Sequence, residues 1–200
     1  MKLTWAIIIL GVLTSCGGEF IPDPLDPRLP RYSEEGKNTA GCFINSEVWQ
    51  AIGEAYSLAN SRNQYLQITF TTDNNTIGIN IGGYQGKSVD SLNTYVELAF
   101  IIDNRDTKIQ SINELEGRTF VLDGDQSFGR IIDSRDFFQY DICRGAGQLH
   151  IRYASAVPDT NDEYIIAGTF SFSVDQPTCR TADVRSGRFD YRVNISPISN

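Results

Sequence analysis

From residue 40 onward, apolar side chains recur at every second position. Six segments share this pattern of one apolar and one largely polar face: Leu66–Phe70, Ile77–Ile81, Val96–Ile102, Leu149–Tyr153, Tyr164–Val174 and Phe189–Val193. Successive side chains of a strand point to opposite faces, so each segment predicts a strand with one buried face. Half-polar strands are typical of antiparallel sheets. The sequence therefore predicts an all-β, antiparallel domain.

Short polar turns connect these segments. Asn45-Ser46 and Asp73–Asn75 each separate two apolar runs, as in β-hairpins. Ser111–Glu114 is a Ser-x-x-Glu capping box, which predicts at most one short helix near residues 112–116. We expect an antiparallel β-sandwich. An up-and-down, calycin-like β-barrel is the alternative, because periodicity does not encode how the sheet edges are closed.

The first fifteen residues have the features of an export signal. Lys2 precedes the apolar run Trp5–Leu13, which is too short to span a bilayer, and small residues lead to Cys16. Leu13-Thr14-Ser15-Cys16 resembles the lipobox of bacterial lipoproteins, whose cysteine is acylated after cleavage. We therefore expect a signal peptide over residues 1–15 and lipidation of Cys16, which would anchor the protein to a membrane of the cell envelope.

Four of the seven prolines lie between residues 22 and 30. Proline-rich chain favours extended geometry, so residues 16–38 are predicted to be a tether, and packing of Leu29–Tyr32 along the domain edge is the alternative. The remaining residues 39–200 have the length of a single β-domain.

The mature chain is acidic. Removal of Lys2 leaves 16 basic residues against 25 acidic ones, a net charge of −9. The basic residues are scattered among carboxylates, which argues against nucleic acid as a partner.

Two motifs frame the domain. The opening combines Leu29-Pro30, Gly36–Asn45 and Trp49, and the ending combines Gly168–Phe172, Cys179 and Gly187–Asp190. Together they resemble an uncharacterised lipoprotein family of Bacteroidota. The resemblance implies an exported, lipid-anchored all-β domain and no assigned activity, and we expect it at the outer membrane, with the membrane face left open.

Beyond Cys16, the mature chain has three cysteines. Cys143 and Cys179 flank the two longest predicted strands and are the expected disulfide, whereas Cys42 lies among apolar residues and is expected to be a buried free thiol. His150, the only histidine, is predicted on a solvated sheet face, so a cysteine–histidine nucleophile and a metal site are both unsupported.

Carboxylates cluster in two turn-like segments, Asp103–Asp106 and Asp123–Asp125. Neither continues as a calcium-binding EF-hand loop, and paired carboxylates for hydrolysis need a separation across a cleft that a sequence does not show. We therefore predict no metal, no cofactor and no enzymatic activity.

Aromatic residues near strand ends are the candidate binding residues: Trp49, Tyr56, Tyr65, Tyr84 and Tyr95. Exposed rings of this kind stack on sugars or contact protein partners. Asp90-Ser91-Leu92 resembles the O-glycosylation acceptor of Bacteroidota envelope proteins, which makes Ser91 a candidate modification site. The sequence thus favours a non-catalytic envelope lipoprotein with a binding or scaffolding role, and a glycan or an envelope protein is the candidate partner. A barrel that binds a small lipophilic ligand is the second hypothesis, and a carboxylate-based hydrolase is the third.

Overall fold

The computed structural model describes residues 21–52, 55–56, 62–63, 66–71, 75–85, 94–133, 143–160 and 162–194. Its elements, in chain order, are β1 (Thr39–Ile44), β2 (Glu47–Ile52), β3 (Ala55–Tyr56), β4 (Arg62–Asn63), β5 (Leu66–Thr71), β6 (Thr76–Gln85), β7 (Thr94–Asp103), the 3-10 turn η1 (Ile112–Leu115), β8 (Thr119–Asp123), β9 (Phe128–Asp133), β10 (Ala146–Ala156), β11 (Glu163–Val174) and β12 (Ala182–Asn194). Every strand pairing is antiparallel, so the predicted fold class is confirmed.

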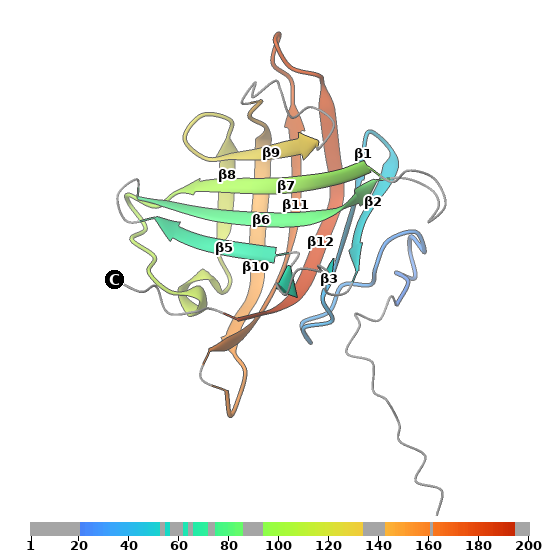
Figure 1. Cartoon of the computed structure of the whole chain (residues 1–200). Coiled ribbons are helices and arrows are strands. Elements are labelled where there is room, and N and C mark those ends of the chain that lie inside the picture. The colour runs from blue at the N-terminus through green and yellow to red at the C-terminus, as the bar shows by residue number, and fades with distance from the viewer. Residues whose placement is uncertain are drawn as a thin grey trace, which may run out of the picture.

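The large sheet has the order β8-β10-β11-β12-β1-β2-β6-β7-β9, and β5 also pairs with β6. Figure 1 shows that β5, β6, β7 and β9 cross in front of β8, β10, β11 and β12. Strands that cross in this way are typical of orthogonally packed sheets, in which the chain passes from one layer to the other at corners. The two layers therefore belong to one continuous sheet.

Two corners bring this sheet close to a closed barrel. At the first, β2 pairs with the end of β6 through Trp49–Gln85 and Gln50–Tyr84. At the second, Gly129 of β9 and Gly145 exchange two backbone hydrogen bonds of 3.0 and 2.7 Å. The expected sandwich does not include these connections. The structure therefore favours the barrel over the sandwich.

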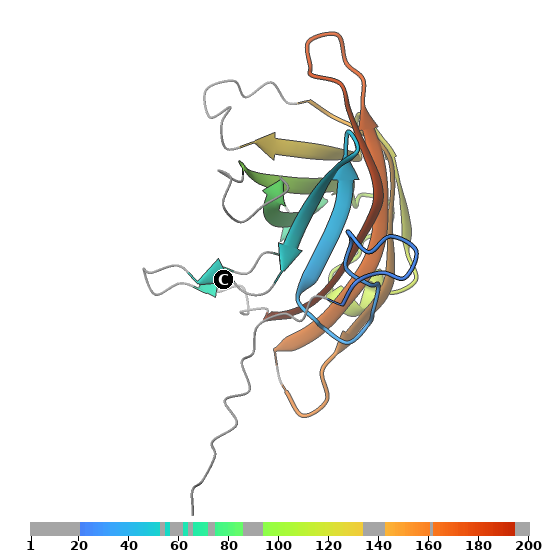
Figure 2. The same ribbon diagram turned by 90° about the vertical axis from the view of Figure 1, so that its right-hand side faces the viewer.

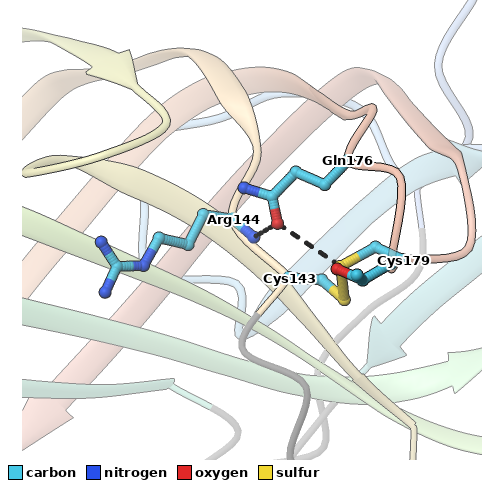
Figure 3. The surroundings of a disulfide bond; sticks show 5 residues. Cys143, Arg144, Gln176 and Cys179 are labelled. Carbon is cyan, nitrogen blue, oxygen red and sulfur yellow. Dashed lines mark hydrogen bonds between the residues drawn. A yellow bond between two sulfur atoms is a disulfide. The ribbon is translucent and has the colours of Figure 1, made fainter.

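The disulfide lies beside the second corner. Cys143, two residues before Gly145, is bonded to Cys179 in the loop between β11 and β12, which confirms the predicted pairing. Gln176 of the same loop accepts a hydrogen bond from the backbone N–H of Arg144, at 3.3 Å (Figure 3). The disulfide therefore fastens the β11–β12 loop to the chain that enters β10.

Aromatic rings fill the middle of the barrel. Phe100 of β7 makes edge-to-face contacts with Phe170 and Phe172 of β11, at centroid distances of 5.1 and 5.7 Å, and Phe189 of β12 lies 6.4 Å from Phe170. All four side chains are at most 3% exposed. Rings from both layers thus pack against one another and form the centre of the core.

Most residues on the predicted apolar faces point inward, but Tyr153 does not. The pairing of β10 with β11 shifts between Ile151 and Tyr153, and the next buried residue is Ala154. This bulge adds one residue to β10 and reverses the alternation after it. The predicted helix is reduced to the single 3-10 turn η1, and the Ser111 hydroxyl bonds the Glu114 carboxylate without capping a backbone N–H.

The largest difference from the sequence prediction lies in residues 21–38, which we call the strap. These residues belong to the predicted tether, but they pack on the outside of the barrel against β1 and β12 (Figure 2), as the alternative prediction gave for Leu29–Tyr32 alone. Leu29 is fully buried, and Pro30 lies where the missing Cβ of Gly41 would be, 2.5 Å from its ideal position. Gly41 of β1 faces outward between the inward residues Ala40 and Cys42. The absence of a side chain at Gly41 thus leaves room on the outer face of the sheet for Pro30 of the strap.

Asp190 of β12 holds the strap in place. It faces outward, as predicted for the polar side of this strand, yet it is only 1% exposed because the strap covers it. Its carboxylate accepts hydrogen bonds from the backbone N–H groups of Glu35, Gly36 and Lys37, at 3.3, 2.7 and 3.1 Å, and from the Ser33 hydroxyl. A buried carboxylate with four donors is well satisfied.

Candidate functional site

The structure separates the five candidate aromatic residues. Tyr84 and Tyr95 are exposed, at 44% and 39%, and lie opposite each other on β6 and β7. Tyr56 is in β3, with its side chain outside the described residues, and Tyr65 also lies outside them. The lipidation candidate Cys16 and the glycosylation candidate Ser91 are outside the described residues as well.

Trp49 is a core residue, so its prediction as a binding residue is wrong. The side chain is fully buried, and its indole N–H donates a 3.0 Å hydrogen bond to the backbone carbonyl of Val96. The ring packs against Gly83 of β6, where an added Cβ would lie 2.6 Å from the indole. Its position on β2 gives it an inward face at the first barrel corner, where a large ring fills the space between the layers.

Tyr84 and Tyr95 form an aromatic pair on the outer face of the barrel. Their ring centroids are 5.6 Å apart and the rings meet edge to face, at 74°. The Tyr95 side chain lies across Gly82, whose missing Cβ would come 2.3 Å from the Tyr95 hydroxyl. Gly82 therefore lets the Tyr95 ring lie down on the strand. We call Gly82, Tyr84, Tyr95 and Glu97 the tyrosine face.

Adjacent glycines in β6 explain both aromatic positions. Gly82 points outward and receives Tyr95, whereas Gly83 points inward and receives Trp49. Glycine inside a strand often marks a place where another group approaches closely. The Gly82-Gly83 pair was thus a sequence signal for two opposed aromatic rings, and it was missed.

Glu97 gives the tyrosine face a carboxyl group. It pairs directly with Gly82, next to the Tyr84–Tyr95 pair along the strands. Burial raises the pKa of the Glu97 carboxyl, and the positive charge of Arg130 on the neighbouring strand β9 lowers it in part. Arg130 itself has a buried Nε with no hydrogen-bond partner among the described residues. The face therefore combines two phenol rings with a half-desolvated carboxyl group and a nearby guanidinium group.

Two of the other candidate carboxylates, Asp103 and Asp123, bond groups of the turns that follow them. Asp123 accepts three backbone N–H bonds from residues 125–127, at 2.8 to 3.0 Å, which together hold its pKa below the ordinary value. Asp103 accepts the backbone N–H and the guanidinium of Arg105, which lower its pKa in the same direction. Among the described residues, no three His, Cys, Asp or Glu side chains are grouped as metal ligands would be.

Cys42 and His150 lie on strands that do not pair with each other, β1 and β10. Cys42 is buried and free, as predicted, and desolvation raises the pKa of its thiol well above the ordinary value, which disfavours the reactive thiolate. His150 lies on β10, where its Nδ1 is 2.7 Å from the hydroxyl of Thr119 on β8.

A second surface feature is a cleft of about 320 Å³ along the strap. Its lining includes Ile21, Tyr32, Glu34 and Lys37. The Tyr32 hydroxyl donates a 2.7 Å hydrogen bond to Glu34, and Arg152 of β10 lies over the Tyr32 ring, at 5.0 Å. Within the lining, Tyr32 pairs with Glu34 and Lys37 pairs with Glu35, and Ser33 donates a hydrogen bond to Asp190, so several of its polar groups bond within the strap or to β12.

Comparison of the chain with known protein families, with curated proteins and with solved structures found no match. No helix within the described part of the chain has the length and apolar character needed to cross a membrane.

Proposed function

We propose that this protein is a non-catalytic, lipid-anchored protein of the bacterial cell envelope, at the outer membrane, which binds a glycan through the tyrosine face. The observation that carries the proposal is the edge-to-face pair of exposed tyrosines lying beside Glu97 on a rigid strand pair. The export signal and the lipobox at Cys16 support the location. The opening and closing motifs support assignment to the Bacteroidota lipoprotein family.

A glycan suits this surface for physical reasons. Sugar rings present apolar C–H faces that stack on aromatic rings, and their hydroxyl groups need polar partners at the edge of the stack. Tyr84 and Tyr95 supply the rings and two hydroxyl groups, and Glu97 supplies a carboxyl acceptor. Because β6 and β7 are paired over ten residues, from Thr76–Asp103 to Gln85–Thr94, the rings stand on a rigid base.

The architecture supports a calycin-like barrel, which raises the second hypothesis of an internal lipophilic ligand. The Phe100, Phe170, Phe172 and Phe189 rings occupy the middle of this barrel and argue against that hypothesis, because a ligand there would have to displace them. The tyrosine face needs no such rearrangement. We therefore place binding on the outside of the barrel.

The test is glycan binding by the chain from Gly17 onward, exported so that the disulfide forms. A glycan array identifies ligands, and calorimetry then compares the parent chain with Tyr84→Ala and Tyr95→Ala. Loss of one stacked ring is expected to weaken binding about tenfold, which corresponds to about 1.4 kcal/mol. Val121→Ala, at another exposed position (73%), is the matched control and should bind like the parent chain.

Two results would contradict the proposal. Binding that is unchanged in both tyrosine variants would move the site elsewhere, and a lipid that copurifies in a one-to-one complex would support the internal-ligand barrel. The anchor is tested separately, because Cys16→Ala should move the full-length protein out of the detergent phase in Triton X-114 partitioning.

A further inference from the structure

The first described residues of the strap form a closed loop with an apolar tip. The backbone N–H of Arg31 bonds the carbonyl of Ile21, at 2.6 Å, and the N–H of Asp23 bonds the carbonyl of Leu29, at 2.9 Å. Pro22 and Pro30 lie opposite each other at the base of this loop. We call residues 21–31 the proline loop.

Hydrogen bonds hold the tip of the proline loop in a fixed turn. The Asp23 carboxylate accepts the backbone N–H groups of Leu25 and Asp26, at 2.8 and 3.1 Å, and pairs with Arg188 of β12. Leu29 is fully buried under the loop, whereas Leu25 is 95% exposed. The loop therefore points one leucine into the protein and holds the other out in solvent.

The proline loop carries two exposed large apolar residues. The described chain has five of them, and Ile21 and Leu25 are two; the others are Tyr84, Tyr95 and Val121. The tyrosine face adjoins the loop, because Gln50 of β2 donates a hydrogen bond to the Arg28 carbonyl and pairs with Tyr84 of β6. The proline loop and the tyrosine face thus meet at the first corner of the barrel.

The position of the proposed anchor determines what lies near the proline loop. Ile21 lies five positions after Cys16, and a fully extended chain covers at most about 3.6 Å per position, or about 18 Å. The proline loop contains two aspartates and two arginines, so it is neutral, although the whole chain has a net charge of −8. A neutral, apolar tip is suited to an anionic lipid surface, from which the acidic remainder of the protein is repelled.

We propose that the proline loop seats the barrel on the membrane, with Leu25 and Ile21 inserted into the lipid interface. This proposal rests on acylation of Cys16, which belongs to the proposed function. The strap then fixes the orientation of the barrel on the membrane. Its apolar tip enters the lipid, and Asp190 and Arg188 bind its other side to the barrel. Single apolar side chains of this kind bind weakly alone and add to the acyl chains.

The test uses the acylated full-length protein in vesicles of phosphatidylethanolamine and phosphatidylglycerol. Leu25→Cys is labelled with an environment-sensitive dye, and Val121→Cys, on β8, is the labelled control. Cys42 is buried and does not compete for the label. On vesicles, the rate of iodide quenching at position 25 should fall about threefold relative to the chain from Gly17 onward, which lacks Cys16, while position 121 stays unchanged, as expected for a side chain in the headgroup region.

The two proposals fail in different ways. Intact-mass measurement and vesicle flotation report on acylation, and a chain that is not acylated would overturn the anchor and the seating together. An acylated chain that floats with vesicles, yet leaves position 25 as open to iodide as position 121, would overturn the seating alone.

Discussion

Replacement of Asp190 by alanine should release the strap. The substitution removes one acceptor that serves three backbone N–H groups and the Ser33 hydroxyl. Hydrogen bonds to a charged group contribute about 1.5–3 kcal/mol each to stability. In the variant, however, the strap can detach from the barrel, and its donors then bond water. The loss of stability is therefore at most the free energy with which the strap docks on the barrel. Burial of Leu29 contributes about 1.5–3 kcal/mol of that docking. We therefore expect Asp190→Ala to lower the free energy of unfolding by about 2–4 kcal/mol.

Urea unfolding at pH 7, with the disulfide intact, measures this loss. Trypsin cleavage after Arg31 and Lys37 reports on the strap itself and should accelerate in the variant. Asp183→Ala is the matched control on the same strand, because its ion pair with Arg185 is about half exposed and contributes at most about 1 kcal/mol. A loss below about 1 kcal/mol in Asp190→Ala, with cleavage as slow as in the parent chain, would refute the reasoning.

Three further predictions concern the core, the disulfide and the tyrosine face. Cys143→Ser/Cys179→Ser opens a cross-link over 36 residues, and in the chain-entropy model this lowers the free energy of unfolding by about 3–4 kcal/mol, measured by urea unfolding. Trp49→Phe leaves the buried Val96 carbonyl without its indole donor and should cost about 1–3 kcal/mol in the same assay, with glycan binding unchanged. At pH 7, Glu97→Gln should have a higher urea midpoint of unfolding than the parent chain. Because burial raises the folded pKa of Glu97 above 4.5, its ionisation opposes folding at neutral pH, and the difference should disappear as the pH falls below 4.5 and both states become protonated. An unchanged urea midpoint at pH 7 would contradict this.

Periodicity predicted which side chains face the core, because this depends only on the alternation within each strand. Ile77, Ile79 and Ile81 are all fully buried, as expected for one face of β6. The prediction was wrong at Tyr153, because the bulge after Ile151 adds one residue to β10 and turns the Tyr153 side chain outward. A bulge changes the pairing partner and leaves the local pattern of apolar residues almost intact.

The candidate site was predicted in part. Tyr84 and Tyr95 were identified as exposed aromatics, but Trp49 was grouped with them, because an aromatic residue near a strand end has the same local pattern whether it lies inside or outside the barrel. The strap was read as a tether because its prolines favour extended chain. Its partner Asp190 is 152 positions beyond Asn38, and no local pattern connects them.

Closure of the barrel also depends on contacts between residues that are not neighbours in the sequence. Gly129 and Gly145 pair at the second corner, and the ring of Phe172 occupies the space where both would carry a Cβ, at 2.6 and 2.5 Å. Any larger side chain at either position would push this ring out of its contact with Phe100. Gly129 in β9, Gly145 just before β10 and Phe172 in β11 therefore determine together that the two layers join. Each of the three residues would also fit an ordinary sandwich strand, so the sequence around any one of them does not distinguish a sandwich from a barrel. The contact among the three residues distinguishes the two folds.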